Sequence, residues 1–371
     1  MVLRECCPRG QEDNMDIKKL MQEMVTRDAS DLFFRAGGIP RLRIDGKVIP
    51  MDSRVLSVED VMFATEQLAN TKQCEAFRNK LDVDFAVYLT EFNRRFRVSI
   101  FTQRNWPSIV IRNVRNKISS FEELNLPAEV LKKLSLETRG LVLLTGSMGS
   151  GKSTTIASMV EFINNNAKKH ILTVEEPIEF TFEDKQSIIN QRELGIDVST
   201  YPVALRAFTL QSPDVMFIGN IRDYDTVSAA MSAAETGVLV LSTLHTINAS
   251  QTVERLINLF PPHQHQEVRN QLASLLKGVI SLRLVPAKNG AGRIPAYEVM
   301  LLTSTISRLI REGKIWEIPQ FIDDGTVFGM RSFNQSLVKL VQDNKIGLED
   351  AALAADNREE FMLAYRGIKK T

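Results

Sequence analysis

The stretch Gly146-Ser147-Met148-Gly149-Ser150-Gly151-Lys152-Ser153 decides the fold of the larger part of this chain. It has the spacing G-x-x-x-x-G-K-S, after an apolar run at residues 141–144 and before a segment, opening at Thr154, that suits a helix. Glycines allow the backbone N–H groups of such a loop to turn inward around phosphate oxygens, and the helix directs its positive dipole end at the same charge. We therefore expect every residue of this stretch, together with Thr154, to contact a nucleotide.

Two side chains of this phosphate-binding loop (P-loop) have expected roles. The Lys152 ammonium suits the β- and γ-phosphates, and the Ser153 hydroxyl suits a Mg²⁺ ion that bridges them. The alternative is a glycine- and serine-rich turn with a surface lysine, which does not account for the flanking strand and helix. ATP and Mg²⁺ are therefore the expected ligands.

The composition is that of an ordinary globular protein. The chain has 371 residues, 44% hydrophobic and 25% charged, so it is long enough for two or three domains with large cores. The net charge is +1 and no long block of like charges occurs, so the overall charge does not favour binding to nucleic acid or to an anionic membrane. The folded protein can still have local basic patches, but we expect no direct nucleic-acid partner.

The cysteines and the hydropathy indicate a reducing compartment. Cys6 and Cys7 are adjacent and Cys74 is distant, which fits neither a disulfide framework nor a metal site. No stretch approaches about 18 apolar residues, and residues 1–14 lack a hydrophobic segment of signal-peptide length. The chain is therefore expected in the cytoplasm, with membrane contact made only through partners.

Residues 1–14 are polar and irregular, and we interpret them as a disordered tail, with an over-extended start of the sequence as the alternative. A helix with one apolar face begins at residue 15 and opens an α+β domain expected over residues 15–115, with a hairpin turn at Asp45-Gly46. Its expected strands cover residues 31–34, 41–44, 47–49, 83–89, 95–101 and 108–114, and its further helices cover residues 57–69 and 72–80. Residues 116–138 are interpreted as the connection to a second domain.

The second domain is expected over residues 139–371, with a helical C-terminal part. Short apolar strands, expected at residues 141–144, 170–174, 215–218 and 238–243, alternate there with helices. This alternation predicts an α/β fold with a largely parallel core sheet covered on both faces. After Ala249 the pattern is mostly helical, with one strand at residues 295–301.

Ligands of such sheets bind beyond the carboxyl ends of the strands, where three polar residues are expected beside the P-loop. Glu175 follows the strand at residues 170–174 and is a candidate to orient or deprotonate the attacking water; the alternative is a solvated acidic turn before Pro177. His245 follows another core strand and is a candidate to sense the γ-phosphate; a histidine with purely structural hydrogen bonds is equally compatible.

The third residue, Asn220, stands after an apolar run in the position where an acid normally faces Mg²⁺, the Walker B position. Asparagine accepts a hydrogen bond from a metal-bound water but brings no charge. One charge pair at about 4 Å is worth roughly 4 kcal/mol at a dielectric of 20, or about a thousandfold in rate as an upper bound. We therefore expect Asn220 to reduce the rate of ATP hydrolysis more than the affinity for nucleotide. Asp214 and Asp223 lie near enough in sequence to replace part of the missing negative charge.

With these residues in hand, the chain resembles the secretion-type ATPases and, within them, the retraction ATPases of the type IV pilus, the PilT/PilU type. The similarity extends over residues 15–365. Besides the P-loop, it rests on Arg95-Phe96-Arg97-Val98, Gln103-Arg104, Glu175-Glu176-Pro177-Ile178-Glu179, Asn190-Gln191-Arg192-Glu193, Ala234-Glu235-Thr236-Gly237, Thr243-Leu244-His245-Thr246 and Ser307-Arg308-Leu309-Ile310-Arg311-Glu312-Gly313-Lys314. The last segment resembles one associated with the retraction branch.

The resemblance implies a PAS-like domain over residues 15–115, a RecA-like ATPase domain over residues 139–371, and a homo-hexameric ring. ATP would sit between the two domains near a subunit boundary, and its hydrolysis would drive pilin back into the inner membrane. An inner-membrane platform protein of the pilus and a paralogous retraction ATPase are the implied partners. By match of motif, Arg95, Arg97, Arg104 and Arg112 would reach the nucleotide from the N-terminal domain, the alternative for each being a surface strand arginine.

Three departures from the family pattern accompany these matches. Asn220 stands where the family has the Walker B glutamate, Leu210 where it has an arginine, and Val238 where it has a histidine. Arg206, upstream of Leu210, remains as a candidate to stabilise charge on the transferring phosphate, beside Glu175 in the acidic-box position.

Three hypotheses follow. The first is a pilus-retraction motor that hydrolyses ATP. The second is a nucleotide-binding, weakly or non-hydrolysing ring partner of an active paralogue. The third is a type II secretion or DNA-uptake motor that uses the same ring.

Overall fold

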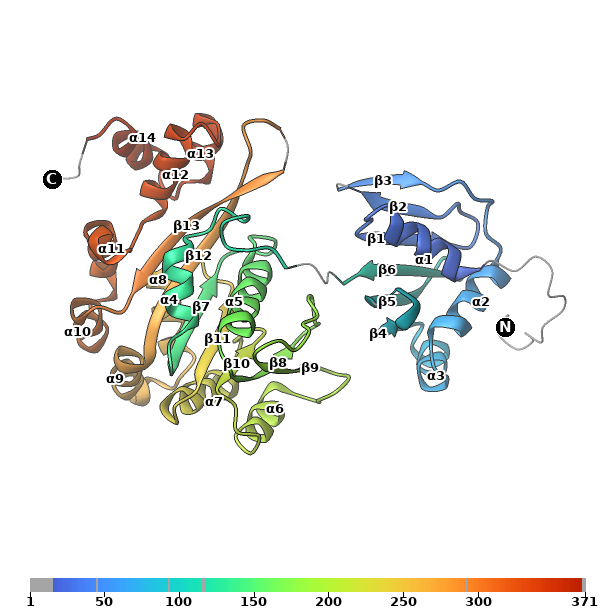
Figure 1. Cartoon of the computed structure of the whole chain (residues 1–371), viewed down its shortest axis with the longest axis horizontal. Helices are drawn as coiled ribbons and strands as arrows, with labels where there is room; N and C mark the ends of the chain where they lie inside the picture. Colours follow the sequence, from blue (N-terminus) through green and yellow to red (C-terminus); the bar gives the residue numbers. More distant parts are fainter. Residues whose placement is uncertain (1–15, 45, 93, 115–117, 291, 369–371) are drawn as a thin grey trace. The chain divides into compact units, whose positions relative to one another are not determined.

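The computed structural model describes residues 16–44, 46–92, 94–114, 118–290 and 292–368. Within these ranges the chain forms two compact units, one ending at residue 114 and the other beginning at residue 118 (Figure 1). The expected tail at residues 1–14, with Cys6 and Cys7, and Asp45 of the expected turn lie outside the described residues. Within the described ranges, none of the helices combines the length and apolar character that a membrane span requires.

An antiparallel sheet in the order β3-β2-β1-β6-β5-β4 organises the first unit. Its strands are β1 (Asp31–Arg35), β2 (Arg41–Ile44), β3 (Lys47–Pro50), β4 (Asp82–Leu89), β5 (Arg94–Gln103) and β6 (Trp106–Asn113), and its helices are α1 (Ile17–Thr26), α2 (Val58–Leu68) and α3 (Thr71–Lys80). Alternate residues of β5, including Phe96 and Val98, point into a core that α1 and α2 close with Met21 and Val61. The strands and helices expected here are confirmed, with ends shifted by one or two residues.

A seven-stranded sheet in the order β13-β12-β7-β11-β10-β8-β9 organises the second unit. Neighbouring strands are parallel except for β13, which runs antiparallel to β12. The strands are β7 (Gly140–Thr145), β8 (His170–Glu175), β9 (Ile188–Glu193), β10 (Val215–Ile218), β11 (Leu239–Leu244), β12 (Leu276–Pro286) and β13 (Arg293–Leu301). The expected α/β fold with a largely parallel sheet is confirmed.

Helices cover both faces of this sheet because its central strands are apolar on both sides. Along β7, Leu141 and Leu143 point into one core, and Val142 and Leu144 point into the other. The second core is closed by α4 (Ala128–Ser135) and α5 (Lys152–Asn166); the first is closed by α6 (Tyr201–Phe208), α7 (Tyr224–Glu235), α8 (Ala249–Asn258), α9 (His265–Leu275), α10 (Ser304–Glu312) and α11 (Ile318–Asp324).

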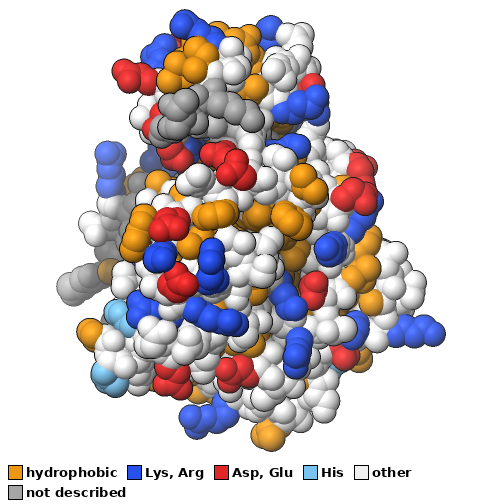
Figure 2. Space-filling model, turned by 90° about the vertical axis from the view of Figure 1, so that its left-hand side faces the viewer, with side chains coloured by type: hydrophobic (Ala, Val, Ile, Leu, Met, Phe, Trp, Pro, Cys, Tyr) orange, Lys and Arg blue, Asp and Glu red, His pale blue; other side chains and the backbone are white. Residues whose placement is uncertain are grey.

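The C-terminal helices form a separate cluster on the β12–β13 hairpin. They are α12 (Phe333–Gln342), α13 (Leu348–Ala354) and α14 (Arg358–Tyr365), shown in red in Figure 1. Phe333 and Phe361 pack there against Val285 of β12 and Ala296 of β13. Figure 2 shows Lys and Arg side chains interspersed with Asp and Glu on one face of the molecule, in keeping with the net charge of +1.

Two expectations about the second unit were wrong, and one strand was missed. The strand β12 lies where helices were expected, because an apolar run buried on both faces carries no period that distinguishes strand from helix. The polar edge strand β9 was missed for the opposite reason, since it has too few apolar residues to show a pattern. The described part of the expected connection, residues 118–138, belongs to the second unit, because Phe121, Leu131 and Leu134 are buried in its core.

Candidate functional site

The P-loop joins the buried strand β7 to the helix α5, as the sequence predicts. Gly149 and Gly151 have φ angles of 74° and 99°, in the left-handed region that favours glycine. A Cβ atom at Gly146 would lie 2.5 Å from the carbonyl oxygen of Leu282, so only glycine fits there. No side chain caps the amino end of α5 in the described structure, and its backbone N–H groups therefore face the loop. This is a cradle for an anion.

Lys152 points into the cradle. Its Nζ atom donates hydrogen bonds to the carbonyl oxygens of Gly146 and Ser147, at 2.7 Å and 2.8 Å. Burial lowers the pKa of this ammonium group from its usual range. Met148 is almost fully exposed, whereas the Ser150 side chain is buried under the loop. The Lys152 ammonium is therefore positioned by two backbone oxygens, which phosphate oxygens can replace when a nucleotide binds.

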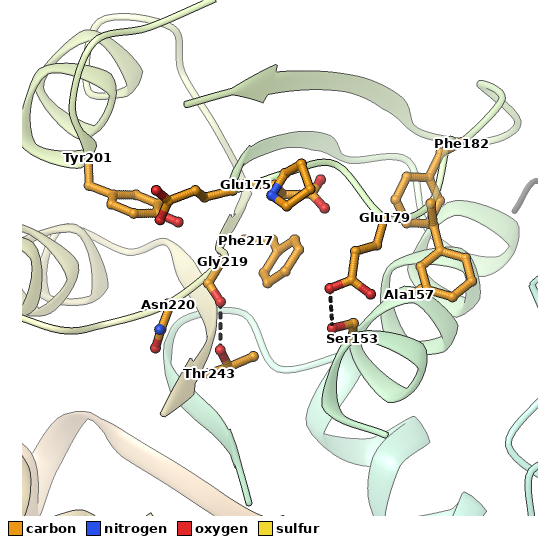
Figure 3. A pocket seen from close by; sticks show the side chains of 13 residues that line it. Ser153, Ala157, Glu175, Glu179, Phe182, Tyr201, Phe217, Gly219, Asn220 and Thr243 are labelled. Atoms are coloured by element: carbon orange, nitrogen blue, oxygen red, sulfur yellow. Dashed lines mark hydrogen bonds between the residues drawn. The ribbon is translucent and has the colours of Figure 1, made fainter. Parts of the chain in front are cut away.

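Ser153 faces a pocket at the carboxyl ends of the strands, where its Oγ atom donates a hydrogen bond to Oε1 of Glu179 at 2.9 Å (Figure 3). The pocket has a volume of about 50 Å³, which suits a few water molecules or a hydrated ion rather than a whole nucleotide. Its polar lining includes Ser153, Glu175, Glu179, Tyr201, Asn220 and Thr243. Glu179 ends the motif Glu175-Glu176-Pro177-Ile178-Glu179, and nothing in its sequence spacing indicates this contact.

Glu175 ends β8 and is buried in the pocket wall, with 6% of its surface exposed. Thr173 Oγ1 donates a hydrogen bond to its Oε1 atom at 2.8 Å, and Gln191 Nε2 of β9 donates another at 3.1 Å. Burial raises the pKa of this carboxyl group to about 7, which the two hydrogen bonds oppose only in part. The interpretation of Glu175 as a solvated turn is therefore wrong. A carboxyl group with this pKa can accept a proton near neutral pH.

Asn220 follows β10 and is as buried as Glu175, with 6% exposed. Its Oδ1 atom has no hydrogen-bond partner among the described residues, although buried amide oxygens are nearly always paired. The neighbouring backbone is held in place, since Thr243 Oγ1 donates to the carbonyl oxygen of Gly219 at 2.6 Å. An unsatisfied oxygen inside a polar pocket fits a water molecule or a hydrated cation, so the site is compatible with Mg²⁺.

His245 follows β11, next to the P-loop. Burial and the nearby Lys152 ammonium lower the pKa of its imidazole, and the Gly146 backbone opposes this by hydrogen bonding. The ring is therefore neutral at neutral pH. It lies at the same edge of the sheet as Glu175 and Asn220, as the sequence predicts.

Another buried carboxyl group, which the sequence did not indicate, is linked by hydrogen bonds to the end of β7. Glu298 of β13 accepts hydrogen bonds from the backbone N–H of Ala249 at 2.7 Å and from Ser281 Oγ at 3.2 Å. Ser281 in turn accepts one from Thr145 Oγ1, the last residue of β7, at 3.0 Å. Burial raises the pKa of Glu298 to about 7. The network ties the strand that carries the P-loop to the helix that follows the His245 segment.

Only one of the three departures lies in the pocket. Leu210 is 86% exposed beyond α6, and Arg206 is exposed on α6 and is not among the pocket's lining residues. Val238 precedes β11, so it lies at the amino end of the strand, on the opposite edge of the sheet from His245. Val238 is therefore not part of the pocket, and Asn220 is the departure that changes the pocket's chemistry.

The arginines expected to reach the nucleotide from the first unit are spread along one hairpin. Arg97 of β5 pairs in register with Arg112 of β6, and Arg112 Nε lies 2.9 Å from Oδ1 of Asp31. Arg95 is two residues from Arg97 on the same strand face. Arg104 lies in the turn between the strands, about 23 Å along β5 from Arg97 at about 3.3 Å per residue.

Comparison with known proteins gives one consistent family. The family model described as "Type II/IV secretion system protein" matches residues 13–323. The type IV pilus ATPase PilU of Pseudomonas aeruginosa is 39% identical over 95% of this chain and 92% of its own length. The type IV pilus retraction ATPase PilT of the same species is 39% identical over 94% of this chain and its whole length.

A solved structure agrees with these relatives. The crystal structure of the pilus retraction motor PilT with bound ADP is 38% identical and superposes with a TM-score of 0.87, covering 94% of this chain and 99% of that one. The ATPase DotB of Legionella pneumophila, at 20% identity and a TM-score of 0.77, shows the same fold. The chain belongs to the type II/IV secretion system protein family and, within it, to the PilT/PilU type of pilus ATPases.

Proposed function

We propose that this chain hydrolyses ATP as one subunit of a homo-hexameric motor that retracts type IV pili, working on the cytoplasmic side of the inner membrane. One observation carries the enzymatic part: Glu175, whose carboxyl pKa is about 7, is buried in the same pocket as the P-loop residue Ser153. The names of the relatives, a retraction ATPase and a pilus ATPase, support pilus retraction as the work that hydrolysis drives.

The P-loop binds the phosphates. Its backbone N–H groups receive the phosphate oxygens, and Lys152 exchanges its hydrogen bonds to the loop carbonyl oxygens for bonds to phosphate. The Ser153 hydroxyl would exchange its hydrogen bond to Glu179 for a bond to Mg²⁺, and the Asn220 oxygen would accept a hydrogen bond from a metal-bound water through one of its two lone pairs. Mg²⁺, when bound, supplies positive charge that stabilises the phosphate oxygens during transfer.

Glu175 and His245 serve the attacking water. The Glu175 carboxylate, held by Thr173 and Gln191, accepts a proton from the water as the water oxygen attacks the terminal phosphorus of ATP and ADP leaves. The neutral His245 imidazole offers one N–H group for a hydrogen bond to the terminal phosphate. Arg95, Arg97, Arg104, Arg112 and Arg206 add positive charge from other parts of the ring in this proposal, with Arg97 and Arg112 acting as a pair.

A second candidate function rests on Asn220. Because this buried residue is neutral, the pocket lacks the charge of a Walker B acid, and a chain that binds ATP but hydrolyses it slowly would assist an active paralogue within the pilus machinery. An inner-membrane platform protein of the pilus remains the proposed partner under both functions.

Steady-state phosphate release with Mg·ATP separates the two functions. We expect turnover in the parent protein and none in Lys152→Ala, with Lys168→Ala as the matched control because Lys168 is exposed just beyond the other end of α5. If the parent binds a fluorescent ATP analogue but releases no more phosphate than Lys152→Ala, the motor assignment fails and the second candidate stands. Restoration of twitching in a host that lacks its retraction ATPase tests the pilus assignment.

A further inference from the structure

Tyr201 places a hydroxyl group in the pocket that packing does not explain. It is the first residue of α6, and its ring belongs to the core beneath the sheet, with 7% exposed. A Cβ atom at Gly219 would lie 3.1 Å from Tyr201 Oη and 3.2 Å from the Glu175 Cα atom, so the hydroxyl lies where β8 and β10 end. Figure 3 shows Tyr201 and Asn220 on the same side of the pocket. A phenylalanine would fill the same core.

The Tyr201 Oη atom has no hydrogen-bond partner within the described ranges of the chain. Buried tyrosine hydroxyls usually have one, because a hydroxyl without a partner loses its hydrogen bonds to water and gains none. The Asn220 Oδ1 atom, in the same pocket, is in the same situation. Two unsatisfied polar atoms in a pocket large enough for water point to a shared ligand that bonds to both.

We propose that Tyr201 and Asn220 bind one water molecule between them and present it to Glu175 as the attacking water of ATP hydrolysis. Tyr201 Oη–H donates to the water oxygen, and the water donates one proton to Asn220 Oδ1 and the other to the Glu175 carboxylate. One lone pair of the water oxygen stays free to attack the terminal phosphorus of ATP. As this P–O bond forms, the bond from that phosphorus to the β-phosphate oxygen breaks, ADP leaves, and the proton of the water goes to Glu175. Tyr201 is thus a positioning residue, and its catalytic role rests on the proposed function.

The environment of Tyr201 keeps its hydroxyl group protonated, so that it can donate a hydrogen bond. Burial raises its pKa to about 12, and the nearby Glu176 carboxylate acts in the same direction while Arg222 opposes it. Glu176 and Arg222 form an ion pair at 2.9 Å, so neither leaves a free charge beside the ring. The tyrosine is therefore protonated at any pH at which the protein works, and the hydrogen-bond direction assigned above does not change with pH.

Tyr201→Phe removes the hydroxyl and leaves the ring. We expect kcat to fall about tenfold, the effect of one lost hydrogen bond in the transition state, with the Kd of a fluorescent ADP analogue unchanged. The Tm of the nucleotide-free protein should be unchanged or raised, because the hydroxyl has no protein partner to lose. Tyr224→Phe is the matched control, since Tyr224 is the first residue of α7 and packs edge-on against Phe260 outside the pocket. A lowered Tm with unchanged kcat would mean a structural role and would overturn the proposal.

A double-mutant cycle tests the shared water. If Tyr201 and Asn220 act through one water molecule, Tyr201→Phe lowers kcat about tenfold in the parent but less than twofold in an Asn220→Ala background. Equal effects in both backgrounds would show that the two residues act separately and would contradict the proposal.

A crystal structure of the nucleotide-free protein gives a readout that does not depend on hydrolysis. We expect electron density for a water molecule within hydrogen-bond distance of both Tyr201 Oη and Asn220 Oδ1, and its loss in Tyr201→Phe. A direct bond between the two side chains, or no water at that position, would overturn the proposal. If this water is present while the parent shows no more turnover than Lys152→Ala, the water assignment stands and the proposed motor function alone fails.

Discussion

Asn220→Glu is the substitution that most directly tests the chemistry of the pocket. It introduces a carboxylate near Glu175, because Glu175 ends β8 and Asn220 lies two residues beyond the end of β10, the parallel neighbour of β8. Both residues line the same pocket, so the new carboxyl group would share it with Glu175. Asn220→Gln is the matched control, since glutamine has the length of glutamate without its charge.

The size of the effect follows from Coulomb's law. A unit charge about 4 Å from an opposite charge is worth roughly 4 kcal/mol at an effective dielectric of 20. If all of it is expressed in the transition state, kcat rises by about a thousandfold, which is an upper bound. Without a cation the same carboxylate repels Glu175, and the folded protein is destabilised until one group takes up a proton. The pKa of about 7 that burial gives Glu175 makes this uptake easy at low pH.

Two assays distinguish charge from shape. We expect Asn220→Glu to release phosphate faster than both the parent and Asn220→Gln, and to melt below Asn220→Gln in EDTA at pH 8 but not at pH 5. Saturating Mg·ADP should reverse the order of melting at pH 8. Equal turnover in the two variants would refute the reasoning, because it would show that the missing charge of a Walker B acid does not limit this enzyme.

Three further substitutions test the site and the domain boundary. Glu175→Gln should lower kcat at least about a hundredfold without weakening ADP binding, which phosphate release and titration check together; retained turnover would remove Glu175 as the base. Glu298→Gln keeps the acceptor oxygen and removes the titration. Because the folded-state pKa of about 7 exceeds the ordinary 4.5, the parent protein loses stability as the pH rises from about 4.5 to 7, so the free energy of unfolding of the variant, measured in urea, should match that of the parent at pH 5 and exceed it by at most about 3 kcal/mol at pH 8. A difference that does not change with pH would contradict this. Leu131→Ala should destabilise the second unit by about 2–5 kcal/mol, because Leu131 is fully buried; urea unfolding of the whole chain measures this. Leu136→Ala, at an exposed position, should change the free energy of unfolding little. Equal effects of the two substitutions would place residues 118–138 outside that core.

The sequence was most informative where a local pattern has one physical cause. The P-loop could be read directly, since its glycines and Lys152 serve a single geometry, and the N-terminal strands could be read because one sheet face is buried and the other is not. The strand β12 could not, because a strand buried on both faces shows no alternation. The segment around Leu131 was assigned to a connection because short helices with polar ends resemble linkers until their core contacts are known.

The candidate site divides in the same way. Glu175, Asn220 and His245 were predicted because each lies at or just after the end of an apolar strand, and parallel strands have their carboxyl ends on one side of the sheet. Tyr201 and Glu298 were not, because nothing within their own segments marks them as different from core residues.

The sequence by itself therefore determined the phosphate cradle, the α/β class and the side chains at the strand ends, because these depend on residues close together along the chain. Only the tertiary structure decided that Glu175 is buried with a pKa of about 7, that Val238 lies away from the pocket, and that the Tyr201 and Asn220 oxygens share it. Burial, pKa and the pairing of polar atoms are set by neighbours distant in sequence, and folding alone brings those neighbours together.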